Sequence, residues 1–185
     1  MKKFGLLALM LTASFNVNSA LLEGKTVNYQ YFFPDITSAY SNASNGDFTV
    51  DSSVEITNIV DSRGSMDISD SNIYVAFTSD SFFTPATFNG FKISDVFDSI
   101  TDFSSVSINA VTNMVGLDLN RITVLANEIW VNWQGLNFTN ETIVSLDINS
   151  SVNPSAVPVP AAAFLFAPAL LGFVGLRRKA KNAIA

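Results

Sequence analysis

Apolar and polar residues alternate along much of the chain between residues 21 and 153. Five segments show this period of two most clearly, namely residues 48–50, 54–57, 73–77, 106–110 and 144–148. Successive side chains of a strand point to opposite faces, so the pattern predicts antiparallel strands with one buried and one solvated face. Helical periodicity is hard to find, and clusters of Ser, Asp, Asn and Gly separate the strands. We therefore expect an all-β body, an antiparallel two-sheet sandwich that is jelly-roll-like or immunoglobulin-like.

Residues 87–93 contain two short arms with Asn89 and Gly90 between them. Asn-Gly is a dipeptide that favours the tight turns of two-residue hairpins. The segment therefore predicts a β-hairpin with Asn89-Gly90 at its tip.

The two ends of the chain depart from this alternation. Residues 1–20 begin with Lys2 and Lys3, continue with an apolar stretch and end in small residues, which predicts a signal peptide cleaved after Ser19 or Ala20 by signal peptidase. Residues 161–176 form an apolar run that would span about 24 Å as a helix, so they predict a short transmembrane segment. Residues 177–185 form a basic tail, and since Lys and Arg favour the cytoplasmic side, the body is expected outside the membrane.

A proline-containing linker, residues 154–160, joins the body to the apolar run. This linker, the short apolar segment and the terminal basic cluster together resemble the PEP-CTERM sorting signal of exported bacterial proteins. Val159 occupies the position where the family often has its namesake glutamate. The residues that carry the resemblance are Val157, Pro158, Val159, Pro160, Arg177, Arg178 and Lys179.

The resemblance covers only the final 29 residues and leaves the body, residues 21–153, unassigned. It implies recognition of the tail by an exosortase, a multi-pass membrane enzyme that processes such tails. It also implies a protein of the cell surface or extracellular matrix of a Gram-negative bacterium, anchored in the membrane transiently or permanently. Extracellular polysaccharide is then a candidate partner.

Charge is distributed unevenly between the body and the two ends. Six of the ten basic residues lie in the ends, so the body keeps four basic residues against all 16 acidic ones, a net charge near −12. A surface this acidic repels nucleic acid, and we expect no nucleic-acid partner.

The chain contains no cysteine and no histidine. Disulfides, Ser-His-Asp and Cys-His catalysis and His-ligated zinc are therefore excluded, as is the Cys-Trp-Cys pattern of an immunoglobulin domain proper. A carboxylate pair of the glycosidase type or a Ser-Lys pair is what remains for catalysis. We expect no enzyme.

Residues 129–134 contain both tryptophans of the chain, Trp130 and Trp133. Alternation predicts that Ile129, Val131 and Trp133 share the core face and that Trp130, Asn132 and Gln134 share the outer face. An exposed indole flanked by two amides is a candidate carbohydrate-binding platform, because the ring stacks on C–H groups while amides bind hydroxyls. The alternative is that loops or a neighbouring layer cover Trp130.

Asp67, Asp70 and Asn72 lie close together in a polar segment. Calcium prefers six to eight oxygen ligands, which such side chains and loop carbonyls supply, although the segment does not match the EF-hand loop. The common role of these residue types is a solvated turn. Calcium is thus a weak candidate, and we expect no other cofactor.

Three function classes remain. The first is a noncatalytic exported surface or matrix protein that is sorted through its tail. The second is a carbohydrate-binding module acting on extracellular polysaccharide, and the third is a carboxylate-dependent glycan-active enzyme.

Overall fold

The computed structural model describes residues 21–150, which form the body of the protein. The signal peptide, the linker with its sorting motif, the transmembrane segment and the basic tail that the sequence predicts lie outside these residues. Within the described residues no helix has the length and apolar character needed to cross a membrane. The described residues also contain a single short helix, the 3₁₀ turn η1 (Leu119–Arg121).

Nine strands form two antiparallel sheets. The first sheet has the order β2-β1-β6-β9-β8 and the second the order β3-β4-β11-β7. The strands of the first sheet are β1 (Thr26–Phe32), β2 (Gly46–Thr49), β6 (Gly90–Asp95), β8 (Ile122–Leu125) and β9 (Glu128–Asn132). The strands of the second sheet are β3 (Gly64–Ser69), β4 (Asn72–Phe77), β7 (Phe103–Ile108) and β11 (Ile143–Ser150). A two-stranded ribbon of β5 (Ser81–Phe82) and β10 (Asn137–Phe138) lies at one end.

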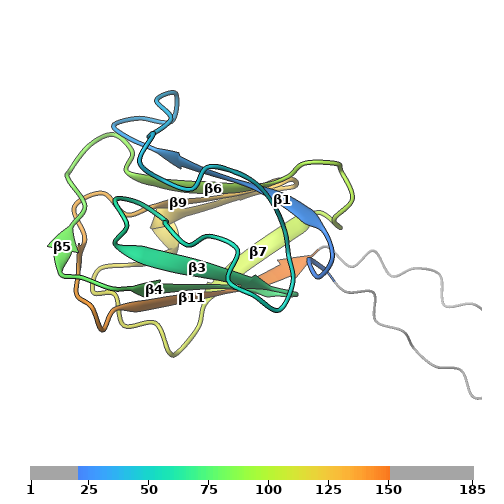
Figure 1. Ribbon diagram of the computed structural model, residues 1–185. Helices are drawn as coiled ribbons and strands as arrows, with labels where there is room; N and C mark the ends of the chain where they lie inside the picture. Colours follow the sequence, from blue (N-terminus) through green and yellow to red (C-terminus); the bar gives the residue numbers. More distant parts are fainter. Residues whose placement is uncertain (1–20, 151–185) are drawn as a thin grey trace, which may run out of the picture. The chain divides into compact units, whose positions relative to one another are not determined.

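Figure 1 shows the two large sheets as two layers, with β1, β6 and β9 in one and β3, β4 and β11 in the other. Buried residues alternate with more exposed ones along these strands, as in β1, where Val27, Tyr29 and Tyr31 are buried. Side chains from both sheets join one hydrophobic cluster. Burial of each large apolar side chain contributes about 1.5 to 3 kcal/mol, so this shared core holds the layers together. The predicted all-β antiparallel body is confirmed, and its arrangement is sandwich-like.

Aromatic rings fill one end of the core around Trp133. The rings of Phe77, Phe83 and Phe91 lie with centroids 5.5, 4.9 and 5.1 Å from the Trp133 ring. Trp133 has no exposed surface, and its indole Nε1 has no hydrogen-bond partner among the described residues. The packing of this region is therefore almost entirely apolar.

The chain enters and leaves the body at the same end. The amide of Leu22 donates to the Asp70 carbonyl at 3.2 Å, and the amide of Ile148 donates to the Ser71 carbonyl at 2.7 Å. Both terminal segments of the body thus pack beside the turn between β3 and β4. Figure 1 places this end opposite β5.

Two local predictions from the sequence are wrong. Asn89-Gly90 is not a hairpin tip, because Gly90 starts β6 and pairs with both Phe32 of β1 and Asn132 of β9. Residues 54–57 do not form a regular strand, and Ile56 makes only an isolated bridge with Met66. In both segments the tertiary pairing partners decided the outcome, and local composition cannot specify them.

Candidate binding site

Strand β9 displays Trp130 on the outer face of the first sheet. Ile129, Val131 and Trp133 have no exposed surface, whereas Trp130 and Asn132 are half-buried on the other side of the strand. The facing that alternation predicts is therefore the facing that the structure shows.

The indole of Trp130 is not a bare platform. The ring of Phe32 stacks on it with centroids 5.3 Å apart and planes at 29°, and the edge of Phe88 meets it at 5.8 Å and 84°. The Nζ atom of Lys92 lies 5.2 Å from the centroid of the Trp130 ring, within the range of a cation–π contact. Trp130 thus belongs to a small cluster on the outer face.

A single salt bridge occurs among the described residues, and it lies beside this indole. Lys92 Nζ and Glu128 Oε1 are 3.1 Å apart, and Trp130 Nε1 donates to Glu128 Oε2 at 2.9 Å. Partial burial by itself raises the pKa of the Glu128 carboxyl, but the hydrogen bonds from Trp130 and Lys92 and the charge of Lys92 outweigh it, so the pKa lies below its ordinary value. Glu128 is therefore ionised at neutral pH.

The amide of Asn132 is already occupied by the protein. Its Oδ1 accepts hydrogen bonds from the amides of Asn89 and Gln134, each at 3.1 Å, and its Nδ2 lies 3.5 Å from the Thr87 carbonyl. Gln134 is held through its backbone carbonyl, which accepts a 2.9 Å hydrogen bond from Arg121 Nη1. Asn132 thus fixes the end of β9 through its side-chain oxygen, and its role in carbohydrate binding stays a prediction.

A shallow hollow of about 350 Å³ lies next to Trp130. It is lined mostly by apolar side chains, among which Ile36 and Leu125 are 56% and 51% exposed. Thr123 and Glu128 are its polar members. The hollow offers an apolar contact surface with one carboxylate, which suits the C–H face of a sugar ring better than a charged ligand.

The three residues of the predicted calcium site lie on the β3–β4 hairpin. Asp67 is in β3, Asp70 is in the turn, and Asn72 starts β4. Asp70 Oδ1 accepts the Leu22 amide at 3.1 Å, while Asn72 Nδ2 donates to Asp147 Oδ1 at 2.7 Å. Among residues 21–150, no group of three or more acidic side chains is arranged to hold a metal ion. These side chains serve the turn and the outer face of the second sheet, and calcium binding stays a prediction.

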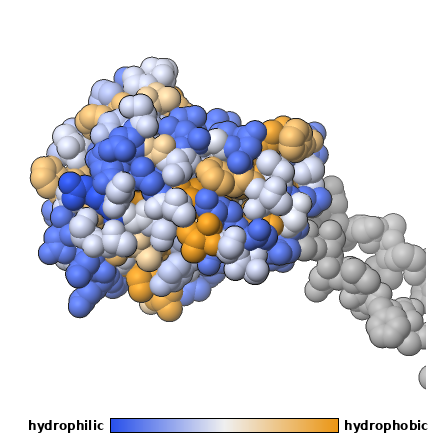
Figure 2. Space-filling view, viewed as in Figure 1, coloured by the Kyte–Doolittle hydropathy of each residue, from blue (hydrophilic) through white to orange (hydrophobic). Residues whose placement is uncertain are grey.

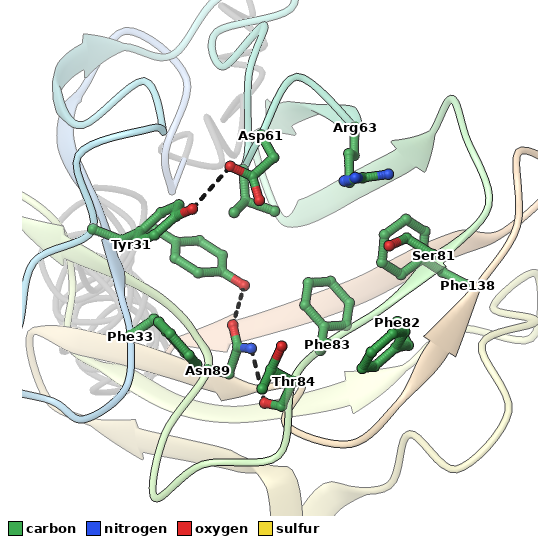
Figure 3. A pocket seen from close by; sticks show the side chains of 12 residues that line it. Tyr31, Phe33, Asp61, Arg63, Ser81, Phe82, Phe83, Thr84, Asn89 and Phe138 are labelled. Atoms are coloured by element: carbon green, nitrogen blue, oxygen red, sulfur yellow. Dashed lines mark hydrogen bonds between the residues drawn. The ribbon is translucent and has the colours of Figure 1, made fainter.

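A second hollow of about 250 Å³ opens at the end of the body that carries β5, and we call it the end pocket. Figure 3 shows Asp61 and Arg63 on one side of this pocket and Phe82, Thr84 and Asn89 on the other. These residues come from loops and strand ends that are far apart in the sequence. No periodic pattern links them, which is why the sequence does not predict this site.

Asp61 is positioned by a tight two-residue turn. Asp61 and Ser62 have positive φ angles of 51° and 56°, and the amide of Arg63 donates to the Val60 carbonyl at 2.9 Å, as in a type I′ turn. The Oδ1 atom of Asp61 accepts hydrogen bonds from Tyr40 Oη at 2.9 Å and Asn42 Nδ2 at 2.7 Å. Neither residue of the turn is glycine, although both lie in the left-handed region that favours glycine, and the hydrogen bonds from Tyr40 and Asn42 hold the carboxylate at the pocket wall.

The floor of the end pocket is also ordered by hydrogen bonds. Tyr31 Oη donates to Asn89 Oδ1 at 2.7 Å, and Asn89 Nδ2 donates to the Thr84 carbonyl at 3.0 Å (Figure 3). Burial, followed by the charge of Asp61, raises the pKa of the Tyr31 hydroxyl well above its ordinary value. Tyr31 is thus a neutral hydrogen-bond donor that fixes the amide of Asn89.

Arg63 is the cation of the end pocket. It is half-buried, and its side chain makes one long hydrogen bond, 3.5 Å from Nη1 to Ser79 Oγ. Among residues 21–150, no carboxylate forms a salt bridge with Arg63. The salt bridge found there joins Lys92 and Glu128. One signal in the sequence points to Arg63, namely that it is one of only four basic residues in an acidic body.

Each of the two hollows is lined by one carboxylate, Glu128 in the hollow beside Trp130 and Asp61 in the end pocket. Glycoside hydrolysis by the common mechanisms needs two carboxyl groups about 5 to 9.5 Å apart. Neither hollow, as lined by the described residues, contains such a pair.

In comparisons with known proteins, no family model, curated protein or solved structure matches this chain.

Proposed function

We propose that the protein is a noncatalytic exported surface or extracellular-matrix protein that is sorted and processed through its C-terminal tail. The observation that carries this proposal is the order of the last 29 residues, with a proline-containing motif, a short apolar run and a basic cluster. Signal peptidase would act at the N-terminus and an exosortase-type enzyme at the tail. The body would then remain at the cell surface or in the extracellular polymer layer of a Gram-negative bacterium.

The body supports this proposal through its surface and its chain ends. Its net charge near −12 favours solubility outside the cell. The face in Figure 2 is largely hydrophilic, with hydrophobic patches separated from one another. Because both ends of the body pack beside the turn at Asp70 and Ser71, removal of either terminal extension would leave the opposite end, with its pocket, intact.

The experiment is mass spectrometry of the protein recovered from cells and from medium, which defines both mature ends and the location. Changing Arg177, Arg178 and Lys179 to Gln should leave export intact and alter tail processing or retention, because these cations resist crossing the bilayer. Lys25→Gln is the control, since it removes a basic residue from the body. Unchanged mature ends and location in the tail variant would contradict the proposal.

The second candidate function is carbohydrate binding through Trp130. The hollow beside this residue, with Ile36 and Leu125 exposed at its rim, is the observation that favours it. If this candidate is correct, Trp130→Ala lowers retention of the protein on extracellular polysaccharide. Leu125→Ser tests the same hollow with an exposed aliphatic residue, and unchanged retention in both variants would exclude this site.

We propose for the body a jelly-roll-like or immunoglobulin-like sandwich topology. The support is that consecutive strands repeatedly cross between the two sheets, as from β2 to β3 and from β6 to β7. Such crossings are typical of Greek-key sandwiches. An experimental structure of the body would distinguish the two topologies.

A further inference from the structure

We propose that the end pocket is a binding site for an acidic sugar, a pyranose that carries a carboxylate, and that Arg63 binds this carboxylate. The proposal goes beyond the proposed function, because it requires neither the sorting tail nor its processing. It also assigns carbohydrate recognition to a different place from the hollow beside Trp130.

The four basic residues of the body differ in whether their charge is paired. Lys92 is paired with Glu128, and Arg121 donates to the carbonyls of Asn132 and Gln134. Lys25 precedes β1, at the end of the body that holds the chain ends. Arg63 remains half-buried in a pocket with one long hydrogen bond.

A carboxylate is the ligand that fits such an arginine. A guanidinium group forms two parallel hydrogen bonds with a planar carboxylate, and hydrogen bonds between charged groups are about twice as strong as neutral ones. A half-buried arginine that forms no salt bridge among the described residues gains from such a ligand. A dianionic phosphate fits less well, because the carboxylate of Asp61 lines the same pocket and repels additional negative charge.

The pocket also offers partners for hydroxyl groups of the ligand. Both hydrogen bonds that Asp61 receives end on Oδ1, so its Oδ2 remains to accept a hydrogen bond from a ligand hydroxyl. Thr84 adds a hydroxyl group on the opposite wall (Figure 3). The pocket therefore selects a carboxylate and hydroxyl groups in the same small molecule.

The shape and size of the pocket suit a single sugar ring. Phe33 and Phe82 provide aromatic walls, and Phe82 is 60% exposed at the rim, where its ring is free to stack on a sugar. A volume of about 250 Å³ is just below the range of about 300 to 1,000 Å³ that is typical of drug-sized ligands. A single sugar ring at the end or in the middle of a chain that continues into solvent suits this size.

The test is calorimetric titration of the full chain, kept in detergent, with an oligogalacturonate and with its methyl ester as the neutral matched ligand. The acid form should bind, and esterification should weaken binding at least about tenfold, because each charge-assisted hydrogen bond contributes more than a neutral one. Arg63→Gln should weaken binding of the acid form by a similar factor. Lys25→Gln, which removes the same charge far from the pocket, should change it less than about twofold.

Two further variants test the proposal even if Arg63→Gln does not fold stably. Phe82→Ala changes an exposed side chain, so it should leave the melting temperature nearly unchanged and still weaken binding. Trp130→Ala should leave binding of the oligogalacturonate unchanged. Equal binding of acid and ester, no binding of either, equal losses in Arg63→Gln and Lys25→Gln, or a loss confined to Trp130→Ala would each overturn the proposal.

Discussion

Phe32 and Trp130 stack with ring centroids 5.3 Å apart although a third strand, β6, lies between their own strands. The residue of β6 that pairs with Phe32 is Gly90, which carries no side chain. Trp130 itself pairs with Lys92, two residues further along β6, so the two rings meet diagonally across the outer face of the sheet. This contact covers part of the indole that the sequence marks as the candidate sugar platform.

The position of Trp130 predicts an intermediate loss of stability on truncation. Trp130→Ala removes the contacts with Phe32 and Phe88 from a half-buried site, so it should lower the free energy of unfolding by about 1 to 2 kcal/mol. Trp133→Ala empties a fully buried site and should cost about 3 to 5 kcal/mol. Urea unfolding of both variants measures the difference.

Fluorescence quenching gives an independent check on the two tryptophans. Acrylamide should quench Trp130 in a Trp133→Phe protein more strongly than Trp133 in a Trp130→Phe protein, because only Trp130 is solvent-accessible. If Trp133→Ala proved the milder substitution and Trp133 the more quenchable residue, the facing of β9 described above would be wrong.

Gly90→Ala should be strongly destabilising. A Cβ atom at this position would lie 1.9 Å from the Val131 carbonyl oxygen, and backbone atoms do not move aside as a flexible side chain does. The cost should reach or exceed the upper end of the about 1 to 3 kcal/mol that overpacking usually takes. Ser94→Ala on the same strand is the control and should stay within about 0.5 kcal/mol of the natural protein. Similar melting temperatures for the two variants would show that β6 and β9 are farther apart here.

Lys92→Gln should raise the pKa of Glu128. The substitution removes a charge and a hydrogen bond that lower this pKa, while the partial burial that raises it remains. Carboxyl chemical shifts in an NMR pH titration follow Glu128 directly, and Lys25→Gln is the matched control.

Because the folded pKa is lowered, the stabilisation from Glu128 is present at neutral pH and is lost as the pH falls through the folded pKa. Its loss should cost less than about 1 kcal/mol, since both side chains are partly exposed. A Glu128 titration that Lys92→Gln leaves unchanged would contradict the pairing.

Alkaline pH should destabilise the body through its buried tyrosines. Burial raises the pKa of Tyr29 and of Tyr31 well above the ordinary value near 10. The unfolded chain loses these protons first, so stability is fully present below about pH 10 and falls by about 1.4 kcal/mol per pH unit for each tyrosine above it, until the folded pKa is reached. Urea unfolding across this range measures the slope.

Tyr29→Phe isolates one of these two contributions. It removes the hydroxyl that donates to the Ile59 carbonyl at 2.7 Å, so it should lower stability at neutral pH by about 1 to 3 kcal/mol. Above about pH 10, the free energy of unfolding of this variant should fall less steeply with pH, because only one buried tyrosine still contributes. An unchanged slope would mean that Tyr29 is not the source of the pH dependence.

The pattern of apolar and polar residues is enough to predict the class of the body and the facing of strand β9. Side chains alternate strictly along a strand, so the apolar positions Ile129, Val131 and Trp133 had to share the core face, and the structure places them there. Composition likewise determined what chemistry is impossible, since the chain lacks histidine and cysteine altogether. These properties are local or additive and do not depend on which strands become neighbours.

Which residues contact one another across the fold cannot be predicted from the same pattern. Asn89-Gly90 has the composition of a turn, yet Gly90 lies within a sheet, where the close backbone of β9 leaves no room for a side chain. Asn132 shares the outer face with Trp130 as alternation predicts, but its hydrogen bond to the Asn89 amide depends on the tertiary structure. The end pocket combines Tyr31, the turn with Asp61 and Arg63, and Phe82, which are three separate segments of the chain. Contacts between residues distant in sequence follow from strand order and loop closure, and no local pattern of hydrophobic and polar residues encodes these.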